Sequence, residues 1–383
     1  MAKDINKKQF TEETELKLDI FRECFREWYP VFVNAPFIQR IYIYDMFAGS
    51  GYDQIGNPGS PLILLEEAKG DKGQYCKHML NGNYPHVYFA FNEKKKNKVE
   101  ELKTNVSKKL ATCNLTCKYE KCVFQENKNL FFRNDDFKNL ITNTNLLNIL
   151  NNNNYAKFIL LDQYGFIQIS DDIFKQLVNA PKTDFIFFIA SSFLRRFSSL
   201  GLVKKYFQDH SIEFDTDKPQ DCHRNVAKYF RSLVPCDKEY YIHHFTIKKN
   251  SNYYGLIFGT NHTLGMEKFL KVCWKHDRFA GESNFNINYD FEEGSLFFEP
   301  NAPNKIKNAK DEISKMILRG VIRSNKEGLK YTLKLGCDPK IFVEVAQSMI
   351  NKGEISIDGK FNKQSANIHK INEYKIILIN ENN

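Results

Sequence analysis

Short apolar runs of strand length alternate with helical segments through the first half of the chain, and this alternation is the strongest constraint on the fold. The strand-like runs lie at 40–45, 86–92, 156–162 and 184–190, and the helical ones at 61–69, 94–109 and 171–179. Several strands are apolar almost without a break, as in parallel sheets covered by helices on both faces. The sequence therefore predicts an α/β fold.

Other segments extend this pattern. Residues 12–28 repeat apolar side chains at helical spacing and predict an amphipathic helix that ends before Pro30. The segments 240–248 and 253–260, joined by four polar residues, predict an antiparallel hairpin after the parallel strands. Residues 100–155 give no clear signal, so the pattern does not place a third strand there.

Prolines and polar residues at 299–304 predict a domain boundary. Beyond it the pattern predicts helices at 309–318 and 339–351 and strands at 353–359 and 374–379, an order typical of a winged helix. We therefore expect an N-terminal helical segment packing on the core at 1–35, a Rossmann-like domain at 36–280, a linker at 281–303 and a winged-helix-like module at 304–383.

Charge is uneven along the chain. Of a net charge of +9, a difference of +6 falls in residues 301–383, which hold 15 Lys or Arg against 9 Asp or Glu. A basic module is a plausible footprint for nucleic acid, although a Lys- and Asn-rich composition can also reflect codon usage alone.

Composition indicates a cytoplasmic protein. The nine cysteines are an odd number and are scattered along the chain, which suits free thiols in a reducing compartment. No apolar run has the length of a membrane span, and no apolar segment follows the charged N-terminus as in a secretory signal. We expect no membrane partner and no metal site.

A glycine-containing loop, Asp45-Met-Phe-Ala-Gly49-Ser-Gly51, directly follows the strand 40–45. Glycines let a backbone turn sharply and approach a ligand closely. Gln54 stands where a dinucleotide site would need its third glycine, and the chain has no phosphate-binding loop of the NTPase type. Ser60 is expected to cap the helix that follows.

The loop resembles the first motif of S-adenosylmethionine-dependent methyltransferases. The resemblance implies a Rossmann-like methyltransferase fold with S-adenosylmethionine as cofactor. It also implies that the loop holds the methionine part, Glu93 the ribose hydroxyls, and Asp135 or Asp136 the adenine amino group. The implied cofactor-binding residues are Asp45, Phe47, Ala48, Gly49, Gly51, Glu93 and Asp136.

A longer series of motifs resembles a narrower family, the three-Cys-motif partner proteins (TcmP). The series covers residues 12 to about 280 and runs through Leu16-Lys-Leu-Asp-Ile-Phe, the glycine loop, Gly59-Ser-Pro-Leu, Asn92-Glu-Lys, Asp136-Phe, Asp162-Gln-Tyr-Gly-Phe and the segment 253–274. The resemblance implies a role in phage or bacterial accessory loci beside a separate protein that bears the three cysteines.

Asp162, Tyr164 and Gly165 follow the apolar strand 156–162, where DNA amino-methyltransferases carry Asp or Asn, two prolines and an aromatic residue. In such enzymes the first residue accepts from the target amine and the aromatic stacks on an extruded base. Gln163 departs from this pattern, because the family usually has proline there. A plain strand-end turn, with Gly165 required by the backbone, is the alternative.

The resemblance thus implies an S-adenosylmethionine-dependent methyltransferase of the TcmP type, with nucleic acid as the candidate methyl acceptor. Two alternatives stay open. The fold can serve as a non-catalytic module that binds cofactor, DNA or a partner. A nuclease is also chemically conceivable, because Asp135, Asp136 and Asp162 could ligate Mg²⁺ if they converged.

Overall fold

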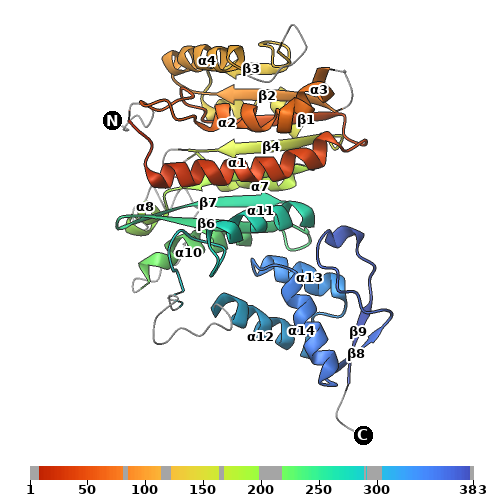
Figure 1. Ribbon diagram of the computed structural model, residues 1–383. Coiled ribbons are helices and arrows are strands. Elements are labelled where there is room, and N and C mark those ends of the chain that lie inside the picture. Colours follow the sequence, from red (N-terminus) through yellow and green to blue (C-terminus); the bar gives the residue numbers. More distant parts are fainter. Residues whose placement is uncertain are drawn as a thin grey trace. The chain divides into compact units, whose positions relative to one another are not determined.

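The computed structural model describes residues 8–80, 85–113, 122–163, 168–197, 218–288, 290 and 304–379. Contacts between residues divide the chain into two units, 1–240 with 247–261, and 241–246 with 262–383. The first unit is built on the parallel part of a sheet (Figure 1), and the second contains helices and a two-stranded sheet.

Seven strands form the main sheet in the order β3-β2-β1-β4-β5-β7-β6. They are β1 (Arg40–Asp45), β2 (His86–Asn92), β3 (Leu130–Arg133), β4 (Tyr155–Leu161), β5 (Thr183–Ile189), β6 (Tyr241–Lys249) and β7 (Asn252–Thr260). β1 is parallel to β2 and β4, whereas β7 is antiparallel to β5. The prediction of a Rossmann-like methyltransferase fold, a mostly parallel sheet with a C-terminal antiparallel hairpin, is confirmed.

Helices connect the parallel strands, as crossover connections require. In the first unit they are α1 (Glu12–Val33), α2 (Ser60–Glu67), α3 (Gln74–Leu80), α4 (Lys96–Ala111), α5 (Phe137–Ile141), α6 (Thr144–Leu150), α7 (Asp171–Asn179), α8 (Ser191–Arg196) and α10 (Cys222–Ser232). Figure 1 shows α1 running in front of the sheet beside α2. The predicted helices at 61–69, 94–109 and 171–179 correspond to α2, α4 and α7.

The first helix packs on the sheet through an aromatic face. The rings of Phe25 and Trp28 lie 5.4 and 5.1 Å from that of Phe158 on β4, and the indole of Trp28 donates to the buried Asp184 carboxylate over 2.5 Å. The prediction that this helix ends before Pro30 was wrong. The helix continues to Val33, which is buried. The stabilisation from burying this last turn is larger than the cost of the one backbone hydrogen bond that Pro30 removes.

The third strand lies at Leu130–Arg133 and pairs in parallel with β2. At four residues it is too short to show a periodic pattern, which explains why the sequence did not place it. The two short helices that follow, α5 and α6, lead to β4. Lys157 on β4 is buried, and its ammonium donates to the carbonyl oxygens of Leu150 and Asn152 at the end of α6.

The second unit contains α11 (Thr263–His276), α12 (Asn304–Leu318), α13 (Asn325–Lys334), α14 (Lys340–Asn351), β8 (Ile355–Asp358) and β9 (Lys375–Leu378). β8 and β9 are antiparallel, and Ser324 forms a further bridge to Lys375. The structure adds α13 to the two predicted helices. The winged-helix assignment of 304–383 stays a prediction.

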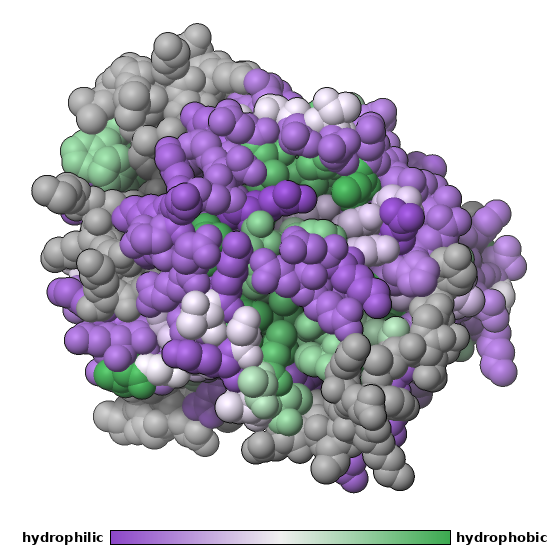
Figure 2. Space-filling model, turned by 90° about the horizontal axis from the view of Figure 1, so that it is seen from above, coloured by the Kyte–Doolittle hydropathy of each residue, from purple (hydrophilic) through white to green (hydrophobic). Residues whose placement is uncertain are grey.

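Hydrophilic residues cover most of the face seen in Figure 2, with hydrophobic residues gathered in narrow strips between them. Of the helices that the structure describes, none combines the length and the apolar character needed to cross a bilayer.

Candidate active site

The strand order reverses between β1 and β4, and open α/β sheets bind ligands at the carboxyl ends of strands at such a point. Backbone bonds join the loops there. The amide of Met46 donates to the Leu160 carbonyl over 3.0 Å, and the amide of Ala48 donates to the Asn92 carbonyl over 2.8 Å. The glycine loop therefore lies against the ends of both neighbouring strands.

The loop has the backbone that its glycines predict. Gly49 and Gly51 have φ values of +64° and +94°, which side chains of L-residues disfavour. A Cβ on Gly51 would also lie 3.0 Å from a methyl of Leu102. The ring of Phe47 packs 5.1 Å from that of Phe137 at the start of α5. The loop 45–51 thus forms a narrow backbone cradle, with Leu102 packed against Gly51 and Phe137 packed against Phe47.

Asp45, the last residue of β1, is fully buried. Its Oδ2 accepts from the Ser60 hydroxyl over 2.6 Å, and its Oδ1 accepts from the Phe47 amide over 3.2 Å. Burial raises the pKa of this carboxyl to about 7, and the nearby Asp162 carboxylate adds to the rise. The prediction that Ser60 caps α2 was wrong, because Gly59 holds that position and the Ser60 hydroxyl turns to Asp45.

Asn92 and Glu93 end β2 and begin the next loop. The Asn92 amide donates to the carbonyls of Met46 and Asp135, and its oxygen accepts from the Asp135 amide, so it ties three strand ends together. One Glu93 oxygen accepts from the Lys95 amide over 2.9 Å, and the other has no partner among the described residues. Sequence reasoning assigned no role to Asn92, although a buried amide before the acid is a signal for one.

The two acids after β3 differ. Asp136 caps α5 through the Lys138 amide and pairs with Lys94 over 2.6 Å; these bonds lower the pKa of its carboxyl. The Lys94 side chain is 75% exposed, and such surface pairs contribute at most about 1 kcal/mol. The Asp135 side chain is exposed and has no partner among the described residues. Both carboxylates are thus accessible to a ligand's amino group.

Asp162 follows β4 and pairs with Lys17 of α1, whose ammonium lies 2.6 Å from Oδ2. Both side chains are largely buried, and the ammonium also lies 4.7 Å from the ring centre of Phe188 on β5. Sequence reasoning missed Lys17; a lysine on the apolar face of an amphipathic helix is the signal that could have found it. Tyr164 and Gly165, the other two predicted residues, lie outside the described residues.

Gln163 is buried next to Asp162. Its side-chain oxygen accepts from the Gln168 amide over 2.9 Å, whereas its Nε2 is a buried donor with no hydrogen-bond partner among the described residues. A buried donor left unsatisfied costs about 1–3 kcal/mol, so such an atom is rare unless something else bonds to it.

The described residues contain no group of three His, Cys, Asp or Glu side chains arranged to hold a metal ion. Of the three aspartates of the nuclease alternative, Asp136 pairs with Lys94 and Asp162 with Lys17, whereas the Asp135 side chain has no partner among the described residues. Cys117, one of the nine cysteines, lies outside the described residues.

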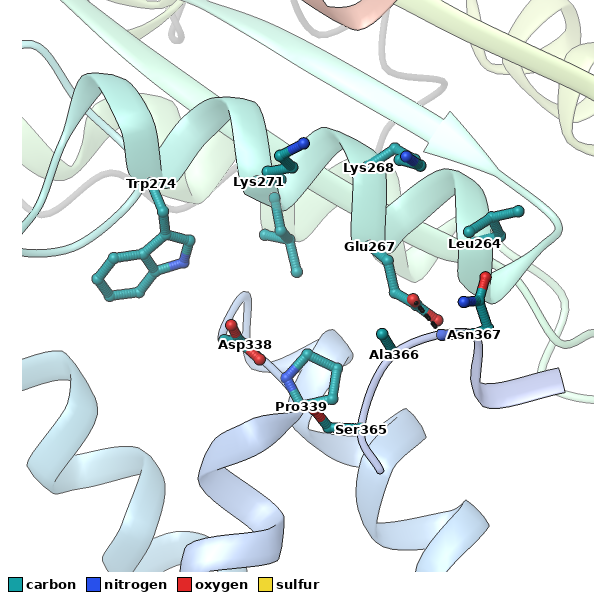
Figure 3. A pocket seen from close by; sticks show the side chains of 11 residues that line it. Leu264, Glu267, Lys268, Lys271, Trp274, Asp338, Pro339, Ser365, Ala366 and Asn367 are labelled. Carbon is teal, nitrogen blue, oxygen red and sulfur yellow. Dashed lines mark hydrogen bonds between the residues drawn. The ribbon is translucent and has the colours of Figure 1, made fainter. Parts of the chain in front are cut away.

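A cavity of about 420 Å³ lies in the second unit, away from the glycine loop in the sequence (Figure 3). Figure 3 shows Glu267 of α11 pointing toward Asn367, whereas Trp274 lies farther along the helix, away from the segment 365–367. The Glu267 carboxylate accepts from the amides of Asn367 and Ile368 over 2.8 and 3.1 Å. This carboxylate is therefore bound to the chain's own backbone.

No protein-family model matches the chain, and no curated protein matches it either. Solved structures that resemble it include Trm1 from Pyrococcus horikoshii in complex with S-adenosyl-L-methionine, at 12% identity and a TM-score of 0.37, covering 96% of this chain and 91% of that one. M. jannaschii TYW2 in complex with AdoMet resembles it at 11% identity and a TM-score of 0.29, covering 66% and 76%. Likeness at this level carries no argument, so the fold assignment rests on the chain's own strand order.

Proposed function

We propose that the protein is an S-adenosylmethionine-dependent methyltransferase. The observation that carries the proposal is the fully buried Asp45 carboxylate beside a backbone cradle of positive-φ glycines. A carboxylate taken out of water is costly unless a positive charge or several donors compensate it. The ammonium and sulfonium of the cofactor supply positive charge at such a position.

The cradle fits the parts of this cofactor. The backbone of Phe47, Ala48, Gly49 and Gly51 would lie against its methionine part, with Asp45 near the ammonium. The unpartnered Glu93 oxygen is an acceptor for ribose hydroxyls. Asp136 would accept from the adenine amino group once Lys94 moves, and Asp135 is the alternative acceptor.

Methyl transfer needs alignment more than acid–base chemistry. When bound, the cofactor supplies an electrophilic methyl group on sulfur. Asp162 Oδ1, which has no partner among the described residues, would accept a hydrogen bond from the acceptor amine and orient its lone pair. Asp162 would thereby align the amine nitrogen with the methyl carbon that the cofactor would supply, and the proton released by the amine would pass to water. Tyr164 would stack on the acceptor base, with Gly165 setting the turn.

Calorimetric titration with S-adenosylhomocysteine tests the cofactor assignment. Gly49→Arg fills the cradle and should abolish binding, and Glu93→Ala should weaken it at least tenfold. Asp136→Asn compared with Asp135→Asn identifies the adenine acceptor. Unchanged affinity in both Gly49→Arg and Glu93→Ala would refute the assignment.

The acceptor that we propose is nucleic acid, bound in part by the basic module 304–383, with a three-Cys-motif protein as an additional partner. The support is the resemblance of the 162–166 motif and of the chain to TcmP proteins, together with the +6 charge difference of 301–383. Incubation with a radiolabelled methyl donor, nucleic acids and the co-encoded neighbour tests this. Label on protein alone would contradict a nucleic-acid acceptor.

A non-catalytic binding module is the second candidate. The Lys17–Asp162 pair favours it, because a lysine already occupies one oxygen of the carboxylate that an acceptor amine would use. Cofactor binding without methyl transfer to any nucleic acid or partner protein would support this candidate over the enzyme.

A further inference from the structure

One face of the sheet is incompletely covered over β1, β2 and β3. Side chains in register on parallel strands point the same way, so alternate residues of the three strands share this face. With α5 and α6 they border a groove of about 440 Å³, the size of a small-ligand site. The sheet-face groove is lined by Arg40, Tyr42, Tyr44, Tyr88, Phe131 and Arg133 of the strands, by Asn92 and Asp135 at the strand ends, and by residues of α5 and α6.

The floor of the groove is aromatic. The rings of Tyr42 and Tyr88 are stacked with centroids 5.0 Å apart and planes 17° apart, and Tyr44 continues the row at 6.0 Å from Tyr42. Tyr42 and Tyr88 are only half-buried. Adjacent strands thus line the groove with stacked tyrosine rings, of which Tyr42 and Tyr88 are partly exposed and Tyr44 is buried.

An arginine stands at each end. Arg40, the first residue of β1, lies 5.9 Å from the ring centre of Tyr88 and donates to the Tyr42 hydroxyl over 3.3 Å. Arg133, the last residue of β3, lies 5.9 Å from the ring centre of Phe131. Among the described residues no carboxylate lies within ion-pair distance of either guanidinium. Most of their donors are therefore available to an anion.

The tyrosine row and the two arginines together indicate which kind of ligand fits the sheet-face groove. An apolar helix from a partner protein would cover two charged guanidiniums without compensating them, which is unfavourable. An anion with no aromatic part would leave the tyrosine row uncovered. A ligand that carries both an aromatic ring and negative charges satisfies both features, and two separated arginines favour two phosphates over one.

We propose that the sheet-face groove binds a single-stranded nucleic acid, with a base stacked on Tyr42 and Tyr88 and the flanking phosphates at Arg40 and Arg133. Bases stack on aromatic side chains with little dependence on sequence, and arginines track the backbone. The exposed amides of Asn143 and Asn145 at the rim can bond to base edges. This inference does not rest on the cofactor assignment, although Asp135, the alternative acceptor for the adenine amino group, borders the same groove.

Fluorescence anisotropy with labelled hexauridylate tests the groove, with saturating S-adenosylhomocysteine present to block nucleoside binding elsewhere. Tyr88→Leu should weaken binding at least fivefold, whereas Tyr88→Phe, which keeps the ring, should bind like the native protein. Arg40→Gln and Arg133→Gln should each weaken binding and reduce the salt dependence by about 0.7 in log–log slope. Lys108→Gln is the matched control, because Lys108 is exposed on α4, which lines no part of the groove.

Cross-linking gives an independent readout. Hexauridylate carrying 4-thiouridine should cross-link to peptides that contain Tyr42 or Tyr88. Native-like affinity of Tyr88→Leu and of both arginine variants, or cross-links confined to residues 304–379, would overturn the proposal. Equal affinity for uridine monophosphate and hexauridylate would contradict binding of a nucleic-acid strand and would indicate a site for a free nucleotide. Gly49→Arg should keep hexauridylate binding even where it loses S-adenosylhomocysteine, so the two proposals fail separately.

Discussion

Two carboxyls, the fully buried Asp45 at the end of β1 and the partly exposed Glu267 on α11, both have pKa values raised by desolvation, but their partners differ. Glu267 accepts from two backbone amides of the segment 367–368. Asp45 accepts from one hydroxyl and one amide and lies beside a cradle of glycine backbone. The Glu267 carboxylate fixes the backbone of the segment 367–368, whereas the Asp45 carboxylate lies beside the glycine loop, where we propose that the cation of the cofactor binds.

The comparison teaches that burial of a charge does not identify a functional site by itself. What distinguishes the carboxyl edge of the main sheet is the collection of groups that the protein leaves incompletely satisfied. These are one oxygen of Glu93, one oxygen of Asp162 and the Gln163 amide nitrogen, none of which has a hydrogen-bond partner among the described residues. Substitutions can test whether each group serves stability or binding.

The largest effect is expected at Lys17. Lys17→Met removes one partner of a largely buried ion pair and leaves Asp162 uncompensated, so the free energy of unfolding should fall by about 3–5 kcal/mol. Chemical denaturation measures this. The double variant Lys17→Met/Asp162→Asn removes the stranded charge and should recover a large part of the loss. If the losses of unfolding free energy in the two single variants added up in the double variant, Lys17 and Asp162 would not interact. That result would contradict the buried ion pair.

The next effect concerns Glu267. Glu267→Ala leaves the amides of Asn367 and Ile368 without their acceptor, and the free energy of unfolding should fall by about 2 kcal/mol. Hydrogen exchange should show faster exchange of these two amides. Affinity for S-adenosylhomocysteine should stay unchanged; a loss of affinity would break the comparison, because Glu267 would then serve binding.

Glu344→Ala is the matched control. Glu344 is exposed on α14 and pairs with Lys310 over 2.9 Å, both side chains being more than 40% exposed. Surface pairs of this kind contribute little, so the free energy of unfolding should change by about 0.5 kcal/mol or less.

Asp45 should make the free energy of unfolding depend on pH. Its pKa is about 7 in the folded chain and near 3.8 when unfolded, so the folded state binds the extra proton between these values. The stabilisation from this group is complete below pH 4 and is lost as the pH rises through 7. Relative to Asp45→Asn, the free energy of unfolding of the native protein should fall by at most about 1.4 kcal/mol per pH unit across this window.

A bound cation reverses the effect. An ammonium or sulfonium beside Asp45 favours the ionised carboxylate, so affinity for the cofactor should rise with pH up to about 7 and then level off. In Asp45→Asn the affinity should be lower and independent of pH in this range. A pH-independent affinity in the native protein would place the cation elsewhere.

The sequence predicted the features that follow from burial and backbone geometry. Strands buried on both faces, such as β4 and β5, are continuous apolar runs, and a loop with two positive-φ residues requires glycines at 49 and 51. Periodicity could not find β3, which is four residues long, or show that α1 continues through Pro30. Both depend on contacts with the rest of the fold.

The candidate site was predicted less completely, because its pairings join distant segments. Lys17 meets Asp162 across 145 positions, and Asn92 meets Asp135 across 43. No local pattern encodes such pairs. The tyrosine row of the sheet-face groove is likewise visible only once the register of β1 and β2 is known, because Tyr42 and Tyr88 are partners in that register.

The smallest effect is expected in the basic module. The outer face of α14 exposes Lys340, Glu344 and Ser348, a nearly neutral set, so this helix offers little to a phosphate backbone. A triple variant with glutamine at Lys334, Lys340 and Lys352 should reduce the log–log salt slope of nucleic-acid binding by less than about 1, against roughly 2 expected if all three touched phosphates of a single strand. Anisotropy at several salt concentrations measures the slope. If the slope fell by about 2, all three lysines would contact phosphates. The net positive charge of 301–383 would then contribute more to nucleic-acid binding than the arginines of the sheet-face groove.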